Sequence, residues 1–297
     1  LNLPEKLTGG LIKSRDEAFL EQFRSSFPFH RIKSLRPIMT KLRLNKEPEE
    51  ITAIQKAIDI TAQALRQALA IVKPGIPEKT IEAEIIRTLI MNRAEGFAFD
   101  PIIASGKNAT TLHYSNNSDT CRDGELLLMD FGAEYQYYAA DITRTIPVNG
   151  RFSTRQKACY QAVVDVMEKT MKQIKPGQTL YELNQTVREE LTAKHIALGL
   201  YSEEELKNAD YPLWKKYFPH GVSHFMGLDV HDVGDKHTTL EKGMVITWEP
   251  GLYIPEEGIG IRIEDDILVD DNPVNLSASL PRSPDEIENL MHKGGNP

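Results

Sequence analysis

Three histidines within thirteen residues form the stretch whose residue types most clearly suggest chemistry. They are His220, His224 and His231, in HGVSHFMGLDVHD. Neutral imidazole is the commonest metal ligand in proteins, although a lone histidine is more often a packing residue. His220 and His224 have the spacing of a zinc pair on a helix, but Gly221 stands where the zinc-protease helix has glutamate, and glycine disfavours a helix. We therefore expect an irregular segment whose role depends on the residues that it meets.

Carboxylates within apolar runs are the residues best suited to meet these histidines. Asp130 lies in LLLMDF and Asp141 in YYAADIT, and each run is typical of a buried strand. If the two runs form a hairpin that turns at Tyr135–Gln136, antiparallel pairing places Asp130 directly opposite Asp141, with Cβ atoms about 5 Å apart.

A second pair of carboxylates repeats this arrangement further along the chain. Glu249 follows the apolar run VITW, and Glu264 ends the run IGIRIE. A turn at Glu256–Glu257 would pair the two runs and bring Glu249 opposite Glu264. A bulge near Pro250–Gly251 could shift that register.

Four carboxylates that face one another in a buried sheet need an explanation for their charge. Burial and mutual repulsion oppose ionisation, so the acids must keep their protons, pair with basic residues or bind cations. Arg144 and Arg262 are the only basic residues in the two predicted hairpins. Two arginines are too few for four acids, and we therefore expect a metal site.

The motifs that hold these residues resemble those of the pita-bread metallopeptidases. The similarity lies in LMDFGAEY, AADITRT, HGVSHFMGLDVHD, WEPGLYI and IRIEDDILV. Within this family, the Xaa-Pro aminopeptidase (aminopeptidase P) branch is the most similar and prolidase is next, from about Pro48 onward. The resemblance implies an α+β fold, with two pseudo-symmetric α/β halves around antiparallel sheets. By contrast, Gly258-Ile-Gly260 is only a weak dinucleotide-binding signal, because no third glycine follows.

The resemblance also implies a ligand set for two divalent ions. Asp141 and Glu264 would bridge the ions, Asp130 would bind one, and His224 and Glu249 would bind the other. Oxygen-rich ligands of this kind suit Mn²⁺ best here, with Co²⁺ or Zn²⁺ as alternatives.

The reaction implied is hydrolysis of the bond between an N-terminal residue and a following proline, by attack of a metal-bridging hydroxide. Glu249 would carry the proton to the leaving nitrogen, and His231 would donate to the developing oxyanion. His113, in LHYSNN, would line the substrate cleft as a further catalytic candidate. The expected substrate-binding residues are His113, His220, His231, Tyr253 and Arg262.

Several other functions stay open at this point. Prolidase would share the ligand set but needs a basic group for the substrate's terminal carboxylate. Arg262 is the main candidate for that group, yet it lies two residues from Glu264 on the same strand face, which better suits a partner of the carboxylates. The GLDVHD continuation disfavours methionine aminopeptidase, and retention of all five ligand types disfavours a creatine-type amidinohydrolase or a metal-free pita-bread binding protein.

Two similar pairs of helices predict how the site is positioned. Residues 49–72 and 77–93 form the first pair and residues 153–174 and 179–197 the second, each interrupted by Lys-Pro-Gly. Chance similarity of two helical hairpins is the alternative to two related halves. Residues 48–297 are expected to form the catalytic domain. Residues 1–47 are expected to be a remnant of an N-terminal domain plus linker, the part through which family members oligomerise, so a homo-oligomer could form.

Composition narrows the partners and the compartment. The 297 residues have a net charge of −8 with both signs interspersed, which argues against nucleic acid as a partner. No apolar run is long enough to span a membrane, and no signal peptide opens the sequence. Cys121 and Cys159 are the only cysteines and are expected to be reduced thiols. We therefore expect a cytoplasmic protein whose partners are peptides with proline in the second position.

Overall fold

The computed structural model describes residues 14–294 of the chain. The chain divides into two compact units, one ending at Arg43 and the other beginning at Leu44. In the first unit, α1 (Arg15–Ser26) begins at a capping box formed by Ser14 and Glu17. A second helix, α2, spans Arg36–Leu44. The expectation that residues 1–47 are the remnant of a larger domain stays a prediction.

The first half of the second unit contains the predicted pair of helices. Pro48 occupies the first turn of α3, and Gly75 adopts a left-handed conformation (φ 88°) in the Lys-Pro-Gly turn between α3 and α4. A sheet of order β2-β3-β6 and another of order β1-β4-β5 follow. The elements are α3 (Pro48–Ile71), α4 (Glu78–Met91), β1 (Gly96–Phe97), β2 (Ile102–Ser105), η1 (Gly106–Thr110), β3 (Leu126–Phe131), β4 (Ala133–Tyr135), β5 (Tyr138–Ala139) and β6 (Ile142–Pro147).

The second half likewise begins with a pair of long helices and continues with strands. Both predicted helices begin at capping boxes, with Ser153 and Gln156 opening α5 and Thr179 and Glu182 opening α6. A sheet of order β11-β10-β7 and a β8-β9 hairpin follow. The elements are α5 (Thr154–Met171), α6 (Leu180–Ala197), α7 (Glu203–Asn208), α8 (Trp214–Tyr217), β7 (Val245–Trp248), β8 (Gly251–Ile254), η2 (Pro255–Glu257), β9 (Ile259–Arg262), β10 (Asp265–Leu268), β11 (Val274–Asn275) and α9 (Pro284–Gly294).

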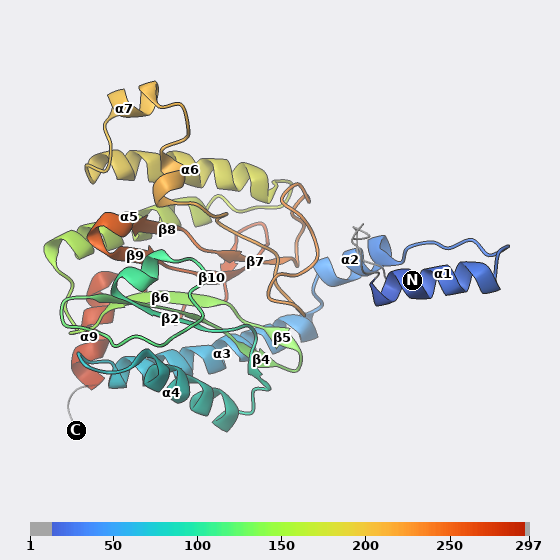
Figure 1. Ribbon diagram of the computed structural model, residues 1–297, viewed down its shortest axis with the longest axis horizontal. Helices are drawn as coiled ribbons and strands as arrows, with labels where there is room; N and C mark the ends of the chain where they lie inside the picture. The colour runs from blue at the N-terminus through green and yellow to red at the C-terminus, as the bar shows by residue number, and fades with distance from the viewer. Residues whose placement is uncertain (1–13, 295–297) are drawn as a thin grey trace. The chain divides into compact units, whose positions relative to one another are not determined.

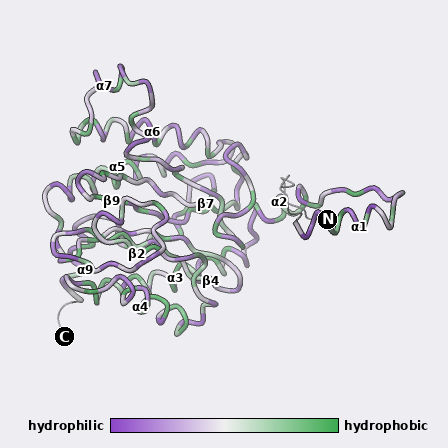
Figure 2. The backbone as a smooth tube through the Cα atoms, viewed as in Figure 1, coloured by the Kyte–Doolittle hydropathy of each residue, from purple (hydrophilic) through white to green (hydrophobic). Residues whose placement is uncertain are grey.

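The strands of the second unit lie between the two helical pairs. Figure 1 shows α3 and α4 on one side of the strands and α5 and α6 on the other. One hydrophobic core cluster joins side chains from all of these helices to both sets of strands, including Leu65, Ile85, Met129, Val163 and Ile261. Figure 2 shows hydrophobic segments along the central strands and the helices that cover them. Burial of this apolar surface holds the two halves together.

The first hairpin turns one residue later than the sequence predicted. Its turn is formed by Gln136 and Tyr137, whose φ angles are 51° and 67°. In the same register, Asp130 on β3 pairs with Thr143 on β6. The prediction that Asp130 lies directly opposite Asp141 is therefore wrong by two residues. Because side chains alternate along a strand, a shift of two leaves both carboxylates on the same face of the sheet.

The second hairpin has the predicted register. Trp248 pairs with Asp265 on one side of the irregular residues, and Gly251 pairs with Arg262 on the other. The same register on both sides brings Glu249 opposite Glu264, so no bulge shifts it.

Within residues 14–294, no helix combines the length and the apolar character needed to cross a membrane. Cys121 and Cys159 are buried and form no disulfide.

Candidate active site

A pocket of about 590 Å³ brings together side chains from both halves of the second unit. Every predicted site residue except Tyr253 lines it. The lining also contains residues that the sequence analysis did not single out, among them Phe99, Asp100, Ser115 and Ser223. The residues predicted from separate motifs therefore do converge on one cavity.

Strand ends and an irregular segment position the acids and histidines. Residues 220–232 contain no helix, as predicted. Backbone hydrogen bonds hold this segment beside β7, since Thr247 donates to the His224 carbonyl over 3.0 Å and Glu249 donates to the Val222 carbonyl over 2.9 Å. Glu264 lies in the break between β9 and β10, and its N–H donates to the Thr143 carbonyl over 3.1 Å. These contacts join the second half to β6.

Three side chains meet the geometric requirement for a shared metal ion. One ligand atom from each of Asp141, His224 and Glu264 lies within 4.8 Å of the others. The Nε2 atom of His224 is 3.4 Å from Asp141 Oδ2 and 3.9 Å from Glu249 Oε1. The Nδ1 atom of His224 lies 3.1 Å from the Phe225 carbonyl. A proton on Nδ1 would be donated to that carbonyl, leaving the lone pair on Nε2 directed toward the carboxylates.

The electrostatics of the acids fit a cation site. Burial, followed by the repulsion of Asp130, raises the pKa of Asp141 well above its usual range. Burial, followed by the repulsion of Asp141, does the same to the pKa of Glu264. Burial also raises the pKa of Glu249 to about 7. Without cations, these carboxyl groups favour their protonated forms.

Asp130 provides a further sign that an ion belongs here. Its Oδ1 atom is buried and has no hydrogen-bond partner among the residues that the structure describes. Buried carboxylate oxygens normally have partners, so this atom is available as a ligand. Together with the clustered acids and the imidazole, it makes a donor set that fits divalent ions.

Arg262 lies against the acids and is occupied by three neighbours. It is 4% exposed, and its Nη2 atom donates to Asp130 Oδ2. Its Nη1 atom donates to the Tyr253 hydroxyl over 2.8 Å, and Nε donates to Thr143 Oγ1 over 3.1 Å. The guanidinium is thus a structural partner of the carboxylates.

Arg144 neutralises an acid outside the predicted set. Its Nη2 atom is 2.6 Å from Asp265 Oδ1, and both side chains are fully buried. The neighbouring Asp266 accepts a hydrogen bond from the Asp141 backbone N–H over 3.1 Å. The run Glu-Asp-Asp is visible in the sequence, but the roles of Asp265 and Asp266 are not, because alternation alone does not show which neighbour each acid meets.

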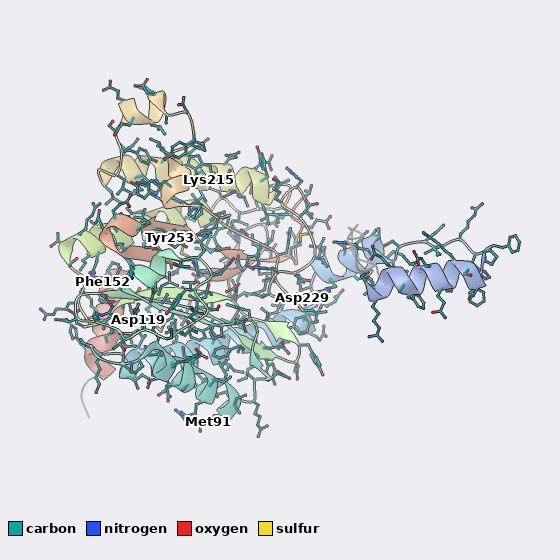
Figure 3. All side chains as sticks on the ribbon, viewed as in Figure 1. Met91, Asp119, Phe152, Lys215, Asp229 and Tyr253 are labelled. Carbon is teal, nitrogen blue, oxygen red and sulfur yellow. The ribbon has the colours of Figure 1, made fainter. Side chains whose placement is uncertain are left out.

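The remaining histidines and Tyr253 surround the cluster. Tyr253, on β8 in the interior of the second unit (Figure 3), places its hydroxyl 2.8 Å from His220 Nε2. Burial, followed by the positive charge of Arg262, lowers the pKa of His220 to about 3, so this imidazole is neutral. The rings of His224 and His231 meet edge to face with centroids 4.3 Å apart. His113 is exposed within the pocket lining.

Comparison with known proteins agrees with this geometry. The sequence matches metallopeptidase family M24 over residues 52–271. It is 40% identical over 269 residues to Xaa-Pro aminopeptidase of Escherichia coli (strain K12), which covers 86% of this chain and 61% of that protein. It is 36% identical over 273 residues to Xaa-Pro aminopeptidase 3 of Homo sapiens, which covers 88% of this chain and 54% of that protein. The chain thus spans between 54% and 61% of the length of these relatives.

Solved structures share the fold. Aminopeptidase P from E. coli with the inhibitor Pro-Leu superposes with a TM-score of 0.88 at 35% identity, covering 97% of this chain and 70% of that chain. Proline aminopeptidase P II from Yersinia pestis has a TM-score of 0.85 at 38% identity, covering 93% of this chain and 68% of that chain. The predicted α+β pita-bread fold is therefore confirmed. With its family motifs, its fold and its convergent acids and histidines, the chain belongs to metallopeptidase family M24.

Proposed function

We propose that the chain hydrolyses the bond between an N-terminal residue and a following proline, using two divalent ions. The observation that carries the proposal is the convergence of Asp141, His224 and Glu264 in one pocket. Family membership supports it, since the relatives compared above are named Xaa-Pro aminopeptidases. The substrates would be peptides with proline in the second position.

The ions would be held by five side chains. Their oxygen-rich character favours Mn²⁺, with Co²⁺ or Zn²⁺ as alternatives. When bound, such ions supply acidification of a water molecule and polarisation of the scissile carbonyl. The ligands would be Asp130, Asp141, His224, Glu249 and Glu264.

The protein's own groups would move the proton and orient the substrate. Glu249, which is 3.4 Å from His220 Nδ1, would take a proton from water and deliver it to the leaving nitrogen. That nitrogen belongs to proline and has no N–H in the peptide, so it must gain a proton to leave. His231 would donate a hydrogen bond to the developing oxyanion. His113 and His220 would position the peptide, with Tyr253 holding His220 at Nε2.

Prolidase activity is the second candidate, and the contacts of Arg262 argue against it. Capturing the terminal carboxylate of a dipeptide needs an available cation. Arg262 already donates to Asp130, Tyr253 and Thr143. We therefore expect the leaving side to accept chain beyond proline.

The test compares Gly-Pro-Ala with Gly-Pro under saturating Mn²⁺. The proposal predicts release of glycine from the tripeptide and slower cleavage of the dipeptide. Efficient cleavage of Gly-Pro with no action on Gly-Pro-Ala would leave prolidase as the function. Folded protein that hydrolyses neither peptide and retains no metal after treatment with Mn²⁺ would favour the metal-free binding protein.

We also propose a cytoplasmic location, which the buried, unpaired Cys121 and Cys159 support. Association through the N-terminal region stays a prediction that sedimentation of the protein can test.

A further inference from the structure

Glu78, the first residue of α4, is a buried carboxylate outside the candidate metal cluster. It is 0% exposed. Its Oε1 atom accepts hydrogen bonds from the backbone N–H and the hydroxyl of Ser105, and each bond is 2.7 Å long. Its Oε2 atom accepts hydrogen bonds from the Tyr114 hydroxyl and from the Asp119 N–H, and each bond is 2.8 Å long. Both oxygens are therefore fully engaged by one segment of the chain.

These donors must supply most of what keeps the carboxylate buried. Within residues 14–292, Glu78 forms no ion pair. A carboxylate is costly to bury unless hydrogen bonds or cations compensate its lost hydration. The N-terminal end of α4 contributes a favourable dipole, but the strong, short contacts come from Ser105, Tyr114 and Asp119. The position of Glu78 and the conformation of this segment are thus coupled.

The donors to Glu78 span residues 105–119, and the last part of this segment, residues 111–119, carries His113 into the pocket. After η1 ends at Thr110, residues 111–119 contain no helix or strand. Leu112, His113 and Ser115 line the pocket. Tyr114 lies between them and instead directs its hydroxyl to Glu78. The tyrosine hydroxyl also accepts a hydrogen bond from the Ser118 N–H over 3.3 Å, which closes the segment on itself.

Asn117 provides a second attachment of the same segment to α4 and β2. It is 1% exposed and has a left-handed backbone (φ 46°), which asparagine tolerates better than most residues. Its Oδ1 atom accepts from the Ile103 N–H over 2.9 Å. Its Nδ2 atom donates hydrogen bonds to Glu82 Oε2 and to the Pro101 carbonyl, and each bond is 2.8 Å long. Side-chain hydrogen bonds therefore replace regular secondary structure in holding residues 111–119.

We propose that Glu78 is a positioning residue that acts through Tyr114 to hold His113 in the substrate pocket. This inference rests on the proposed function for its kinetic consequence, but the anchoring itself does not. Glu78 does not line the pocket, and its hydrogen-bond partners Ser105, Tyr114 and Asp119 include none of the predicted metal ligands. Its effect on catalysis would therefore pass through the conformation of residues 111–119.

The first test removes only one hydroxyl. Tyr114→Phe deletes the donor to Glu78 Oε2 while keeping the ring. The matched control is Tyr201→Phe, because the buried Tyr201 hydroxyl lies 3.1 Å from His195 Nδ1, outside the pocket. Backbone hydrogen exchange is measured in metal-free protein without substrate. We expect faster exchange across residues 106–119 in Tyr114→Phe and wild-type exchange there in Tyr201→Phe. Equal exchange in that segment for wild type and Tyr114→Phe overturns the proposal, whatever the protein hydrolyses.

The second test asks whether the effect passes through His113. Loss of a hydrogen bond to a charged group predicts a fall of about tenfold in kcat/KM for Gly-Pro-Ala in Tyr114→Phe. In a His113→Ala background, the same substitution should cause no further fall, because the group being positioned is gone. Independent, multiplying effects of the two substitutions would contradict positioning of His113. Absence of hydrolysis in the wild type would refute the proposed function and leave the exchange result to decide the anchoring.

Glu78→Gln tests the same hydrogen bond by changing its acceptor. The amide keeps one acceptor oxygen but replaces the other with a donor, which cannot accept from Tyr114 and Asp119. If this variant folds, it should match or exceed Tyr114→Phe in the exchange of residues 106–119 and in the kcat/KM loss. A folded Glu78→Gln protein with wild-type exchange and kinetics would also overturn the proposal.

Discussion

Arg262 on β9 binds Asp130 on β3 through a buried hydrogen bond from Nη2 to Oδ2. This contact occupies one oxygen of the carboxylate, while Oδ1 has no hydrogen-bond partner within the described part of the chain. The contact with arginine therefore leaves Oδ1 as the oxygen of Asp130 that is available to a metal ion. Since Arg262 also contacts Tyr253 and Thr143, it connects strands of both halves at the candidate metal site.

Replacing Arg262 should weaken metal binding without removing a predicted ligand. Arg262→Gln removes the hydrogen bond that orients Asp130, and loss of such a partner typically lowers metal affinity by about 10–100-fold. Isothermal titration with Mn²⁺ measures the change. Arg155→Gln is the matched control, because Arg155 pairs with Glu257 at the surface. Equal affinities in the two variants would contradict a supporting role for Arg262.

The buried acids should destabilise the protein when metal is removed. Burial and the neighbouring Asp141 raise the pKa of Glu264, so its charged form is unfavourable there. Glu264→Gln is neutral at every pH, so it removes the cost of keeping this buried carboxyl either charged or protonated, and its amide oxygen can still accept the hydrogen bond that Thr143 Oγ1 donates over 2.6 Å. In EDTA we expect the variant to be more stable by about 1–2 kcal/mol while its peptidase activity is lost. Thermal unfolding with and without Mn²⁺ tests this, and a less stable variant in EDTA would argue that the acids do not repel one another.

His195 should make stability depend on pH. Its side chain is fully buried on α6, and burial lowers its pKa to about 4. An unfolded histidine titrates near 6.5, so the unfolded state binds the proton first as the pH falls. The stabilising contribution is present above pH 6.5 and is lost progressively toward pH 4, by about 2 kcal/mol between pH 7 and pH 5. Urea unfolding at both pH values should show a smaller loss for His195→Leu than for wild type. His237→Leu, at an exposed position, should keep the wild-type dependence. Identical pH dependence in wild type and His195→Leu would exclude this role.

The sequence predicted the helical pairs well because their ends carry local signals. The capping boxes at Ser153 and Thr179 and the Lys-Pro-Gly turns act over three or four residues. The turn of the first hairpin was harder to predict, because Gln136 and Tyr137 adopt left-handed conformations that usually favour glycine or asparagine. Nothing local marks such a turn, and the register was therefore misplaced by two residues.

The candidate site was predictable where residues recur in recognisable motifs. The supporting contacts were not, because they join distant parts of the chain. Glu78 reads as an ordinary acid at a helix N-terminus, yet it accepts a hydrogen bond from the Asp119 N–H, 41 residues away. Arg144 lies in the first predicted hairpin, yet its partner is Asp265, 121 residues away. Such partners follow from tertiary packing and leave no spacing pattern.

The central claim is that the acids and His224 form a two-metal centre, and metal content tests it most directly. The purified chain is saturated with Mn²⁺, freed of excess ion and measured by elemental analysis, with circular dichroism as the check on folding. The account predicts about two ions per chain in the wild type and fewer in Asp130→Asn, which lacks one carboxylate ligand. Folded wild-type protein that retains no metal after this treatment would contradict the account.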